Sequence, residues 1–427
     1  MKMGKMTSGL AMLALLATCG GLTSCQKTAD DTVELTFLNG KSEVVDWIDS
    51  KIKEFETANP KIKVTQEFDK DASSALKTKI NSGDIPDLTT VYETSLVNGD
   101  YYYDMSAYSA WSRVTPSVKE LCTDPLTNKQ FRLATNKSTA GLFYNKEIFT
   151  ACGITSEPTT WADFTADIAK ITAKNYIPLY MGGSETWMLG HLMEFWGHGI
   201  IKENLGNVAA NLAFIKNDQT KLNFTGTGSA IKSFATRFLE LKALNCWNSD
   251  FVTASYDDQI ENFATGKAAM ISQGMWALSK ITTKNAAMAS KIGFMAYPSM
   301  DETLAKKAVI LSDVDSGYSV MKATKHPAEV QEFLNFLWNA ENQKAYCELV
   351  SAPSAFTDVD ANWSPIKDTV QTALSNGFNI GFTSTPSGFG GGECGALIQS
   401  LYIGDYTADT FTTKYAADWD AAYKANA

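Results

Sequence analysis

The sequence predicts an α/β fold whose chain opens with a β-strand, an α-helix and a second β-strand. Residues Val33–Leu38 and Lys61–Phe68 are apolar or alternating runs of strand length, and the apolar residues between them recur at helical spacing. A β-α-β succession favours a parallel sheet, because a crossover must bring the second strand alongside the first. The 427 residues are enough for two domains with separate hydrophobic cores.

Strands and helices continue to alternate along the chain. In the first helix, Val44, Ile48, Ile52 and Phe55 form one apolar face, and Asn59-Pro60 ends it. Later strands are expected at 85–91, 141–144, 177–181, 268–271, 292–298 and within 312–321. Later helices are expected at 75–81, after Thr160, through much of 203–262, from Met275, from Pro327 and near the C-terminus. The aromatic stripes of the helix after Thr160 and of the last helix are interpreted as core.

Polar and aromatic side chains follow several strands at their carboxyl ends, where open α/β sheets bind ligands. The loop after the first strand carries Asn39, Lys41 and Glu43, and a later loop carries Glu185 and Trp187. A carboxylate beside a Trp suits a sugar, which has an apolar face and a polar rim. We expect these side chains to contribute to a ligand site; for the first three, solvated loop residues are the alternative.

The segment Ala264–Ile281 combines a short buried strand at 268–271, a break at Gln273-Gly274 and a helix start at Met275. Glycine lets the backbone approach a ligand closely, and helix N-termini present free N–H groups. Trp276 stands at this junction and offers a flat apolar face with one N–H donor. It is therefore a candidate face for a sugar ring, with a core Trp packed under the helix as the alternative.

The N-terminus has the features of a secretory signal. Two lysines precede the apolar run Leu10–Ala17, which is too short to span a membrane. The run Leu22-Thr23-Ser24-Cys25 resembles a bacterial lipobox, which implies that 1–24 is a cleaved signal peptide and that Cys25 carries lipid. An ordinary signal peptide with an incidental Cys is the alternative. Residues 25–32 would form a lipidated tether, and no later apolar run is long enough to cross a bilayer.

Composition excludes some classes of partner and site. Loss of residues 1–24, which include two lysines, leaves 403 residues and changes the formal net charge from −10 to −12. An acidic chain with three arginines is a poor nucleic-acid binder. The cysteines after Cys25 are odd in number, widely spaced and without a CxxC pair, which fits neither a disulfide framework nor a zinc site. A single disulfide stays open among Cys122, Cys152, Cys246, Cys347 and Cys394.

Several motifs occur in one order along the chain. They are LTFLNG, SGDIPDL, GLFYNKEIF, FATGKAAMISQGMW, DSGYSV and HPAEVQEFLNFLW. From about Val33 to the C-terminus the chain thereby resembles the family 1 extracellular solute-binding proteins of bacterial ABC importers, the maltose-binding-protein-like group. The resemblance implies a two-lobed periplasmic-binding-protein-like fold of type II, in which helices flank a mostly parallel sheet in each lobe. It also implies a monomer that has no enzymatic activity and needs no cofactor.

The same resemblance implies where the lobes and their connections lie. The N-lobe and the C-lobe are expected at 33–140 with 299–347 and at 141–298 with 348–427. Three crossing hinge segments are expected near Ala140–Phe143, Phe294–Pro298 and Glu348–Pro353. A ligand would bind between the lobes and favour their closure, and the closed protein would dock on the transmembrane permease subunits.

The family's ligand contacts can be transferred by motif onto this sequence. Together with Trp187, the expected ligand-binding residues are Asn39, Lys41, Glu43, Tyr92, Ser184, Glu185, Trp276, Asp313 and Asp315. A late aromatic contact is expected within 378–393, at Phe378 or Phe389. Near Tyr92, Glu93 and Ser95 replace the charged pair expected of a disaccharide binder, so the identity of the ligand stays open.

The sequence gives less support to other functions. A glycoside hydrolase needs a carboxylate pair such as Glu185 and Glu194, but pairs are frequent among 47 acidic residues, and the chain has neither an HExxH nor a GxSxG motif. A surface lipoprotein that captures glycans without a transporter would use the same site. A polyol, glycerol phosphate or peptide could replace the sugar, although the acidic candidate residues disfavour an anion. We expect a membrane-anchored lipoprotein that binds a mono- or oligosaccharide for an ABC importer.

Overall fold

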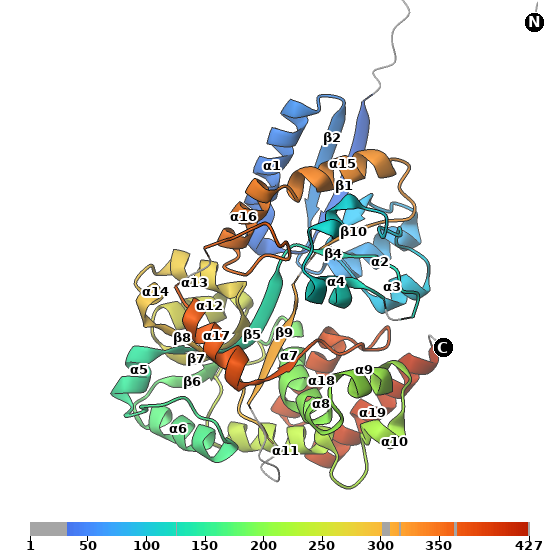
Figure 1. The fold of residues 1–427 in the computed structure, drawn as a ribbon. Coiled ribbons are helices and arrows are strands. Elements are labelled where there is room, and N and C mark those ends of the chain that lie inside the picture. The colour runs from blue at the N-terminus through green and yellow to red at the C-terminus, as the bar shows by residue number, and fades with distance from the viewer. Residues whose placement is uncertain (1–31, 125, 301–307, 316, 363–364, 426–427) are drawn as a thin grey trace, which may run out of the picture.

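The chain folds into two β-sheets, each with its own helices. The structure is a computed structural model that describes residues 32–124, 126–300, 308–315, 317–362 and 365–425. The first sheet and its helices form the upper part of the molecule in Figure 1, and the second sheet forms the lower part. The predicted signal peptide 1–24, Cys25 and the tether up to residue 31 lie outside the described residues.

The first sheet has the strand order β2-β1-β3-β10-β4. β1 (Val33–Asn39) is parallel to β2 (Ile62–Phe68) and to β3 (Leu88–Thr89), which confirms the predicted β-α-β start. β10 (Gly317–Val320) runs antiparallel between β3 and β4 (Leu133–Ala134). The helices of this half are η1 (Ser42–Val44), α1 (Val45–Ala58), α2 (Ala72–Ser82), α3 (Thr94–Asn98), η2 (Ser109–Ser112), α4 (Pro116–Cys122), α15 (Pro327–Leu337) and α16 (Ala340–Leu349).

Helix α1 follows the sequence pattern closely. Ile48, Ile52 and Phe55 are its buried residues, as their spacing requires. The Phe55 ring packs against Phe333 of α15, with centroids 5.0 Å apart. At the C-terminus the Asn59 N–H donates to the Phe55 carbonyl, and the following proline, which has no N–H, cannot extend the helix.

The second sheet has the order β11-β9-β5-β7-β6, and β8 also pairs with β5. Its central strand β5 is antiparallel to β7, β8 and β9, whereas β6–β7 and β9–β11 are parallel pairs. This sheet is therefore mixed, not mostly parallel as expected. The reason is that β5 comes directly from the first sheet and not from a crossover helix. The strands are β5 (Lys137–Asn145), β6 (Ile177–Tyr180), β7 (Ala268–Gly274), β8 (Ile292–Met295), β9 (Val309–Val314) and β11 (Phe378–Ile380).

Fourteen helical segments in the described ranges accompany the second sheet. One of them, Met193–His198, is a π-helix that continues α7 into α8. The segments are α5 (Lys146–Ala151), α6 (Trp161–Ala173), α7 (Trp187–Leu192), η3 (Met193–His198), α8 (Gly199–Leu205), α9 (Asn207–Ile215), α10 (Gln219–Leu222), α11 (Ala230–Ala243), α12 (Tyr256–Ala264), α13 (Ala277–Lys284), α14 (Met288–Lys291), α17 (Lys367–Asn376), α18 (Gly391–Ile403) and α19 (Ala408–Ala425).

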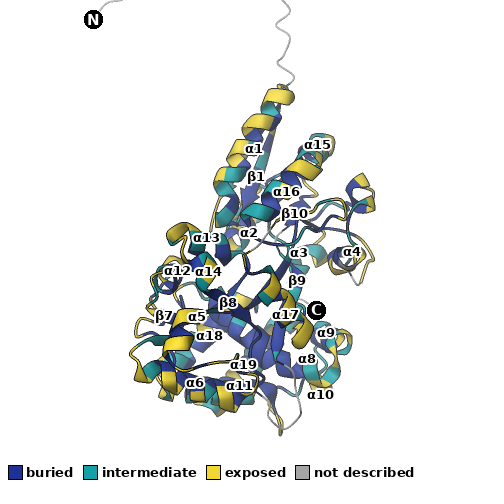
Figure 2. Ribbon diagram, turned by 60° about the vertical axis from the view of Figure 1, so that its left-hand side comes forward, coloured by how far each residue is buried: buried dark blue, intermediate teal, exposed yellow. Residues whose placement is uncertain are grey.

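Each sheet lies in a hydrophobic core of its own, as a two-lobed fold requires. The core of the first half includes Phe37 and Trp338, and that of the second includes Phe143 and Trp196. Figure 2 shows buried residues along both sheets and exposed ones on the outer faces of the helices. The aromatic stripes interpreted as core are buried, as Trp161 on α6 and three residues of α19 show: Phe411, Tyr415 and Trp419.

Hydrogen bonds join the connections between the two sheets near Asn136. Asn136 lies in the first connection, between β4 and β5. In the second connection, after β9, the Asp315 N–H donates to the Asn136 carbonyl over 3.2 Å. In the third, after α16, the Pro353 carbonyl accepts from the Lys137 N–H at 3.0 Å. The three connections therefore meet in one small region, which is the place where a hinge between the halves would bend.

Two of the expected crossing segments lie elsewhere. Ala140–Phe143 is inside β5, and Phe294–Pro298 overlaps β8, so both belong to the second sheet. β9, within the expected N-lobe range 299–347, also pairs in the second sheet. A buried strand has the same apolar sequence pattern in either sheet, so the pattern alone placed these two segments wrongly. The third segment, Glu348–Pro353, contains the Pro353 contact. The lobe limits stay a prediction, and the strand pairing favours crossings at 135–136 and just after β9.

Candidate functional site

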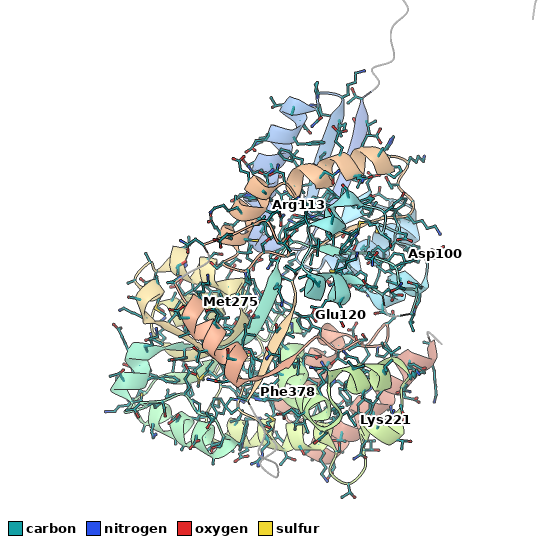
Figure 3. All side chains as sticks on the ribbon, in the orientation of Figure 1. Asp100, Arg113, Glu120, Lys221, Met275 and Phe378 are labelled. Atoms are coloured by element: carbon teal, nitrogen blue, oxygen red, sulfur yellow. The ribbon has the colours of Figure 1, made fainter. Side chains whose placement is uncertain are left out.

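Six side chains with rings gather in the half built on the second sheet. They come from α7 and the π-helix η3, from the start of α12, from the turn after β7 and from the segment after β11. Centroids of neighbouring rings lie 5.1–6.1 Å apart. Figure 3 labels Met275, which precedes one of them, and Phe378 of β11, both in the lower half of the molecule. We call this group the aromatic cluster: Trp187, His191, Phe195, Tyr256, Trp276 and Phe382.

Trp276 is held by a chain of buried amides. Its indole Nε1–H donates to Gln273 Oε1 over 2.9 Å, and Gln273 Nε2–H donates to Gln259 Oε1 over 2.6 Å. Gln259 in turn donates to the Tyr180 carbonyl at the end of β6. Both glutamines are buried, so each needs these partners. The indole is thus fixed in orientation and has only its faces to offer, because its N–H is already engaged.

Gly274 is the residue that lets the indole lie against the backbone. β7 continues through Gln273 to Gly274, so the expected break after 268–271 is wrong, and α13 begins one residue after Trp276. A Cβ atom at Gly274 would lie 2.0 Å from a ring carbon of Trp276. Only glycine leaves room for the ring at this point. The strand is longer than expected because Gln273, though polar, is satisfied inside the core.

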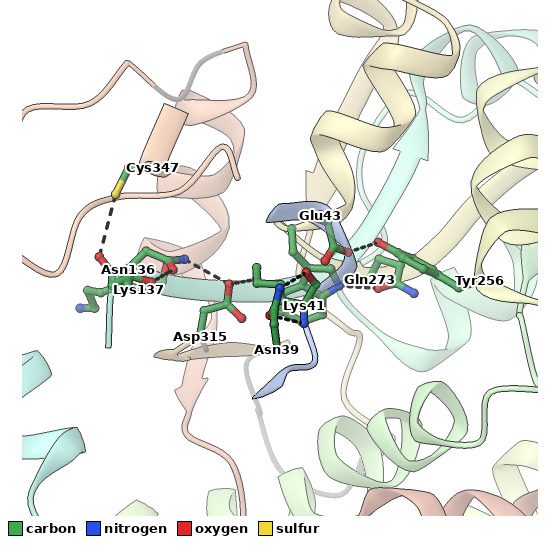
Figure 4. Close-up of polar contacts among 11 residues, drawn as sticks. Asn39, Lys41, Glu43, Asn136, Lys137, Tyr256, Gln273, Asp315 and Cys347 are labelled. Atoms are coloured by element: carbon green, nitrogen blue, oxygen red, sulfur yellow. Dashed lines mark hydrogen bonds and ion pairs between the residues drawn. The ribbon is translucent and has the colours of Figure 1, made fainter. Parts of the chain in front are cut away.

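Glu185 joins the loop after β6 to the start of α12. One carboxylate oxygen accepts from the Tyr256 backbone N–H over 3.0 Å, and the other accepts from Trp187 Nε1–H over 3.4 Å. A carboxylate at a helix N-terminus is also favoured by the helix dipole. The Tyr256 hydroxyl then donates to Glu43 of the first half over 3.2 Å (Figure 4). Glu43, Glu185, Trp187 and Tyr256 therefore form one connected group that spans both halves.

His191 lies at the centre of the aromatic cluster. Its ring centroid is 5.1 Å from Trp187, 5.5 Å from Phe382 and 6.1 Å from Trp276. The side chain is half-buried. Burial lowers its pKa to about 4, and the negative charge of Glu194, one turn away, opposes this effect only in part. The imidazole is therefore neutral at physiological pH.

Phe382 is fixed through its backbone. Asp313 at the end of β9 uses one oxygen to accept from Val314 N–H and the other to accept from Phe382 N–H, over 2.6 and 2.7 Å. The Phe382 side chain is 37% exposed. Of the aromatics expected within 378–393, Phe389 instead is buried against Tyr415. Phe382 is the residue of that range whose ring reaches the cluster.

A group of buried charged side chains binds the segment around Phe382 through its neighbours Gly381 and Thr383. Lys202 pairs with Glu194 and donates to the Gly381 carbonyl, and the Thr383 hydroxyl donates to Glu194. His198 contacts the other Glu194 oxygen over 3.0 Å. Burial favours the neutral acid, but Lys202 and then His198 hold the pKa of Glu194 well below its usual range. We call Glu194, His198, Lys202 and Thr383 the buried ion cluster.

The remaining charged candidates lie beside the hinge. Lys41 forms an ion pair with Asp315, whose Oδ2 also accepts from Asn136 Nδ2–H (Figure 4). Burial alone would lower the pKa of Lys41, but the Asp315 charge raises it above its usual value, so the ammonium stays protonated. Asn39 accepts from the Lys41 N–H over 2.8 Å and donates to Gln66 over 2.7 Å. The Lys41 ammonium and the Asn39 amide are therefore engaged within the protein, and Asp315 binds both of its partners through Oδ2.

Two further candidates lie apart from these contacts. Tyr92 stacks on Tyr102 with ring centroids 5.8 Å apart, and the guanidinium of Arg132 lies 4.5 Å from its ring centroid. Tyr92 therefore belongs to the first half and touches no ring of the aromatic cluster. Ser184 is exposed, and its backbone N–H donates to the Ala254 carbonyl. Their role in ligand binding stays a prediction.

Sequence reasoning missed His191, Phe195, Tyr256 and Phe382. Trp187, His191 and Phe195 follow at intervals of four residues, which puts them on one face of a helix, so this stripe was a readable signal. Tyr256 is the first residue of α12, whose N-terminus is closed by a capping box of Ser255 and Asp258. No comparable sequence pattern marks Phe382, because only the tertiary hydrogen bond to Asp313 places it.

Other kinds of site can be tested on the described residues. In that part of the chain no group of three His, Cys, Asp or Glu side chains could hold a metal ion. The cysteines from Cys122 onward are buried and unpaired there. None of the described helices is both long and apolar enough to pass through a membrane. A cavity of about 30 Å³ lies behind α7, lined in part by Gly190, Glu194 and Trp419.

Comparison with known proteins decides the family. A family model described as bacterial extracellular solute-binding protein matches residues 41–344. The chain belongs to this family. The match begins in the loop after β1 and ends in α16, so it includes the first two connections between the sheets and, except for Phe382, the aromatic cluster. Members of the family bind solutes outside the cell and are not enzymes.

Individual proteins are similar to this solute-binding protein along most of its length. The multiple sugar-binding protein of Streptococcus mutans is 26% identical over 371 residues, which are 85% of this chain and 84% of that protein. The sn-glycerol-3-phosphate-binding periplasmic protein UgpB of Escherichia coli is 24% identical over 69% of this chain and 68% of UgpB. The structure of a sugar transporter from Bacillus licheniformis in complex with stachyose has a TM-score of 0.76 at 19% sequence identity. The alignment covers 91% of this chain and 100% of that structure. The last comparison confirms the two-lobed type II fold.

Proposed function

We propose that this solute-binding protein captures a mono- or oligosaccharide at the aromatic cluster and delivers it to the permease of an ABC importer. The ligand would lie between the two halves, and their closure around the hinge at Asn136 would hold it. The similarity to a multiple sugar-binding protein supports this choice of ligand. UgpB is named for binding sn-glycerol 3-phosphate, and its similarity makes that anion the competing candidate.

The observation that carries the proposal is the chemistry of the aromatic cluster. Trp187 and Trp276 are half-buried, and their N–H groups are bonded to Glu185 and Gln273. They therefore offer flat apolar faces in fixed positions, which match the apolar face of a pyranose ring. An aromatic contact of this kind contributes about 0.5–1.5 kcal/mol beyond area burial. Three basic groups near the site are paired with carboxylates, which disfavours an anionic ligand: Lys41 with Asp315, Lys202 with Glu194, and Lys280, whose ammonium lies 4.8 Å from the Tyr256 ring centroid, with Asp257.

We propose further that the protein has no hydrolase activity. A retaining or inverting glycosidase needs one carboxyl group that stays protonated near neutral pH. Glu194 does not meet this need, because Lys202 and His198 keep its pKa low. Glu185 is engaged by two N–H donors. Incubation with oligosaccharides should therefore yield no cleavage products, and the appearance of any would contradict this part of the proposal.

A thermal-shift screen of residues 26–427 would test the sugar assignment. The panel would contain stachyose, sucrose, glucose, glycerol and sn-glycerol 3-phosphate. A ligand at 100 times its Kd stabilises the folded state by about 2.7 kcal/mol, so we expect a clear rise in melting temperature with at least one sugar. We expect this rise to disappear in Trp276→Ala, because the stacking face is lost.

Trp47→Ala is the matched control for this screen. Trp47 is also half-buried, but it lies on α1 in the first half and packs against Tyr346. The control should lower the melting temperature without ligand and keep the sugar-induced rise. A rise only with sn-glycerol 3-phosphate would replace the sugar by that anion. An unchanged rise in Trp276→Ala would move the binding site away from the aromatic cluster.

We propose that Cys25 anchors the protein, as a monomer, to the outer face of the cell membrane. The N-terminal sequence supports this, since two or three acyl chains hold a protein firmly. In Cys25→Ser we expect the protein to appear in the soluble or secreted fraction and to incorporate no labelled palmitate. Cys122→Ser, at a buried position, should stay in the membrane fraction. Retention of Cys25→Ser in that fraction would contradict the lipid anchor.

A further inference from the structure

The polar atoms of the aromatic cluster are almost all engaged inside the protein. Trp187 Nε1–H donates to Glu185, Trp276 Nε1–H donates to Gln273, and the Tyr256 hydroxyl donates to Glu43. Phe195 and Phe382 have no polar side-chain atoms. A sugar bound against these rings would therefore find apolar faces and, apart from the Tyr256 oxygen as an acceptor, no partner for its hydroxyl groups among them.

His191 is the exception. It stands in van der Waals distance of four rings, and its own ring is half-buried. Among the described residues none forms a hydrogen bond or an ion pair with either ring nitrogen. Neither nitrogen is one of the fully buried, unpartnered polar atoms of the described residues, so both are accessible, and a ligand hydroxyl group can supply the missing partner.

The charged groups around His191 are occupied elsewhere. On its own helical run, Glu194 faces Lys202 and His198 in the buried ion cluster. From the loop after β6, Glu185 accepts from two N–H groups. From β9, Asp313 holds the backbone of Phe382. With no carboxylate bound to the imidazole, the ring stays neutral and keeps one donor and one acceptor nitrogen.

We propose that His191 binds the ligand directly, as a neutral imidazole that hydrogen-bonds to a hydroxyl group of an uncharged sugar between the rings of Trp187, Trp276 and Phe382. This inference rests on the proposed function and names the polar contact of that site. It also explains discrimination against charged ligands. An imidazolium enclosed by four aromatic rings would be poorly solvated, so His191 offers an anion an N–H donor but no positive charge to offset the loss of its hydration.

Titration calorimetry with the sugar that gives the largest thermal shift would test the role of His191. In His191→Phe, which keeps a ring of similar shape, we expect the Kd to rise at least tenfold. His191→Asn, which restores a donor and an acceptor, should recover part of the affinity. His326→Phe is the control, because His326 is also half-buried but lies at the N-cap position of α15 in the first half; the Kd of this variant should match that of the wild type.

Ring-nitrogen NMR on the wild-type protein gives a second readout that does not depend on a variant folding. The chain has three histidines, so the signals can be assigned from the variants. We expect the free protein to show His191 titrating near pH 4 and the sugar to shift its nitrogen signals and lower that midpoint. The inference about His191 would be overturned, with the proposed function intact, if His191→Phe bound the sugar as tightly as the wild type. It would also be overturned if the sugar left the His191 nitrogen signals unchanged. Failure of the wild type to bind any sugar would overturn the proposed function with it.

Discussion

Lys202→Met should lower the free energy of unfolding by about 3–5 kcal/mol, as expected when one partner of a buried ion pair is removed. Lys202 is fully buried, and its ammonium group pairs with Glu194 and bonds the Gly381 carbonyl. Without it the Glu194 charge remains in a desolvated place with fewer partners. Urea unfolding of the ligand-free protein would measure the loss.

The double variant Glu194→Gln/Lys202→Met separates charge from packing. Removal of both charges should restore at least half of the lost stability, because a neutral pair leaves no uncompensated charge. Lys232→Met is the control: its partner Asp409 and Lys232 itself are exposed, so the change should stay within about 0.5 kcal/mol. A Lys202→Met variant as stable as this control would show that the pair contributes little.

The same ion pair gives a stability that depends on pH. The pKa of Glu194 is lowered in the folded state, so its contribution is complete above its unfolded pKa of about 4.3. It is lost as the pH falls from there toward the folded pKa. In Lys202→Met the folded pKa should rise, and the acid-side decline of the unfolding free energy should become less steep.

Gly274→Ala should weaken sugar binding at least tenfold, which corresponds to about 1.4 kcal/mol. The added Cβ atom would meet the Trp276 ring at 2.0 Å, so either the indole moves or the end of β7 shifts. Overpacking of this kind also lowers the free energy of unfolding by about 1–3 kcal/mol. Calorimetry with the preferred sugar and urea unfolding would measure the two effects.

Gly392→Ala is the control for that substitution. At Gly392, in the first turn of α18, an added Cβ would find its nearest neighbour, Thr186 Oγ1, at 3.6 Å, which is an ordinary contact. Its affinity and stability should stay close to those of the wild type. If Gly274→Ala kept full affinity, the fixed position of Trp276 would not matter for binding.

The fold was largely predictable from sequence because it depends on local patterns. The strand–helix–strand start and the apolar face of α1 follow from residue spacing alone. The hinge positions did not, since Ala140–Phe143 lies within β5 and Phe294–Pro298 overlaps β8, and apolar segments of this kind fit either sheet. Only the pairing of β5 with β8 and β9 assigns them to the second sheet.

For the site, the sequence by itself determined which aromatic and charged side chains follow the strands, with Trp276 and Trp187 foremost. The tertiary structure decided what each can do. Lys41 is bound to Asp315, which lies 274 positions away, whereas His191, one helical turn after Trp187, keeps both ring nitrogens for other partners. Spacing can report a shared helix face, but a hydrogen bond between distant segments exists only once the chain has folded. The polar atoms left for a ligand are therefore a property of the tertiary structure.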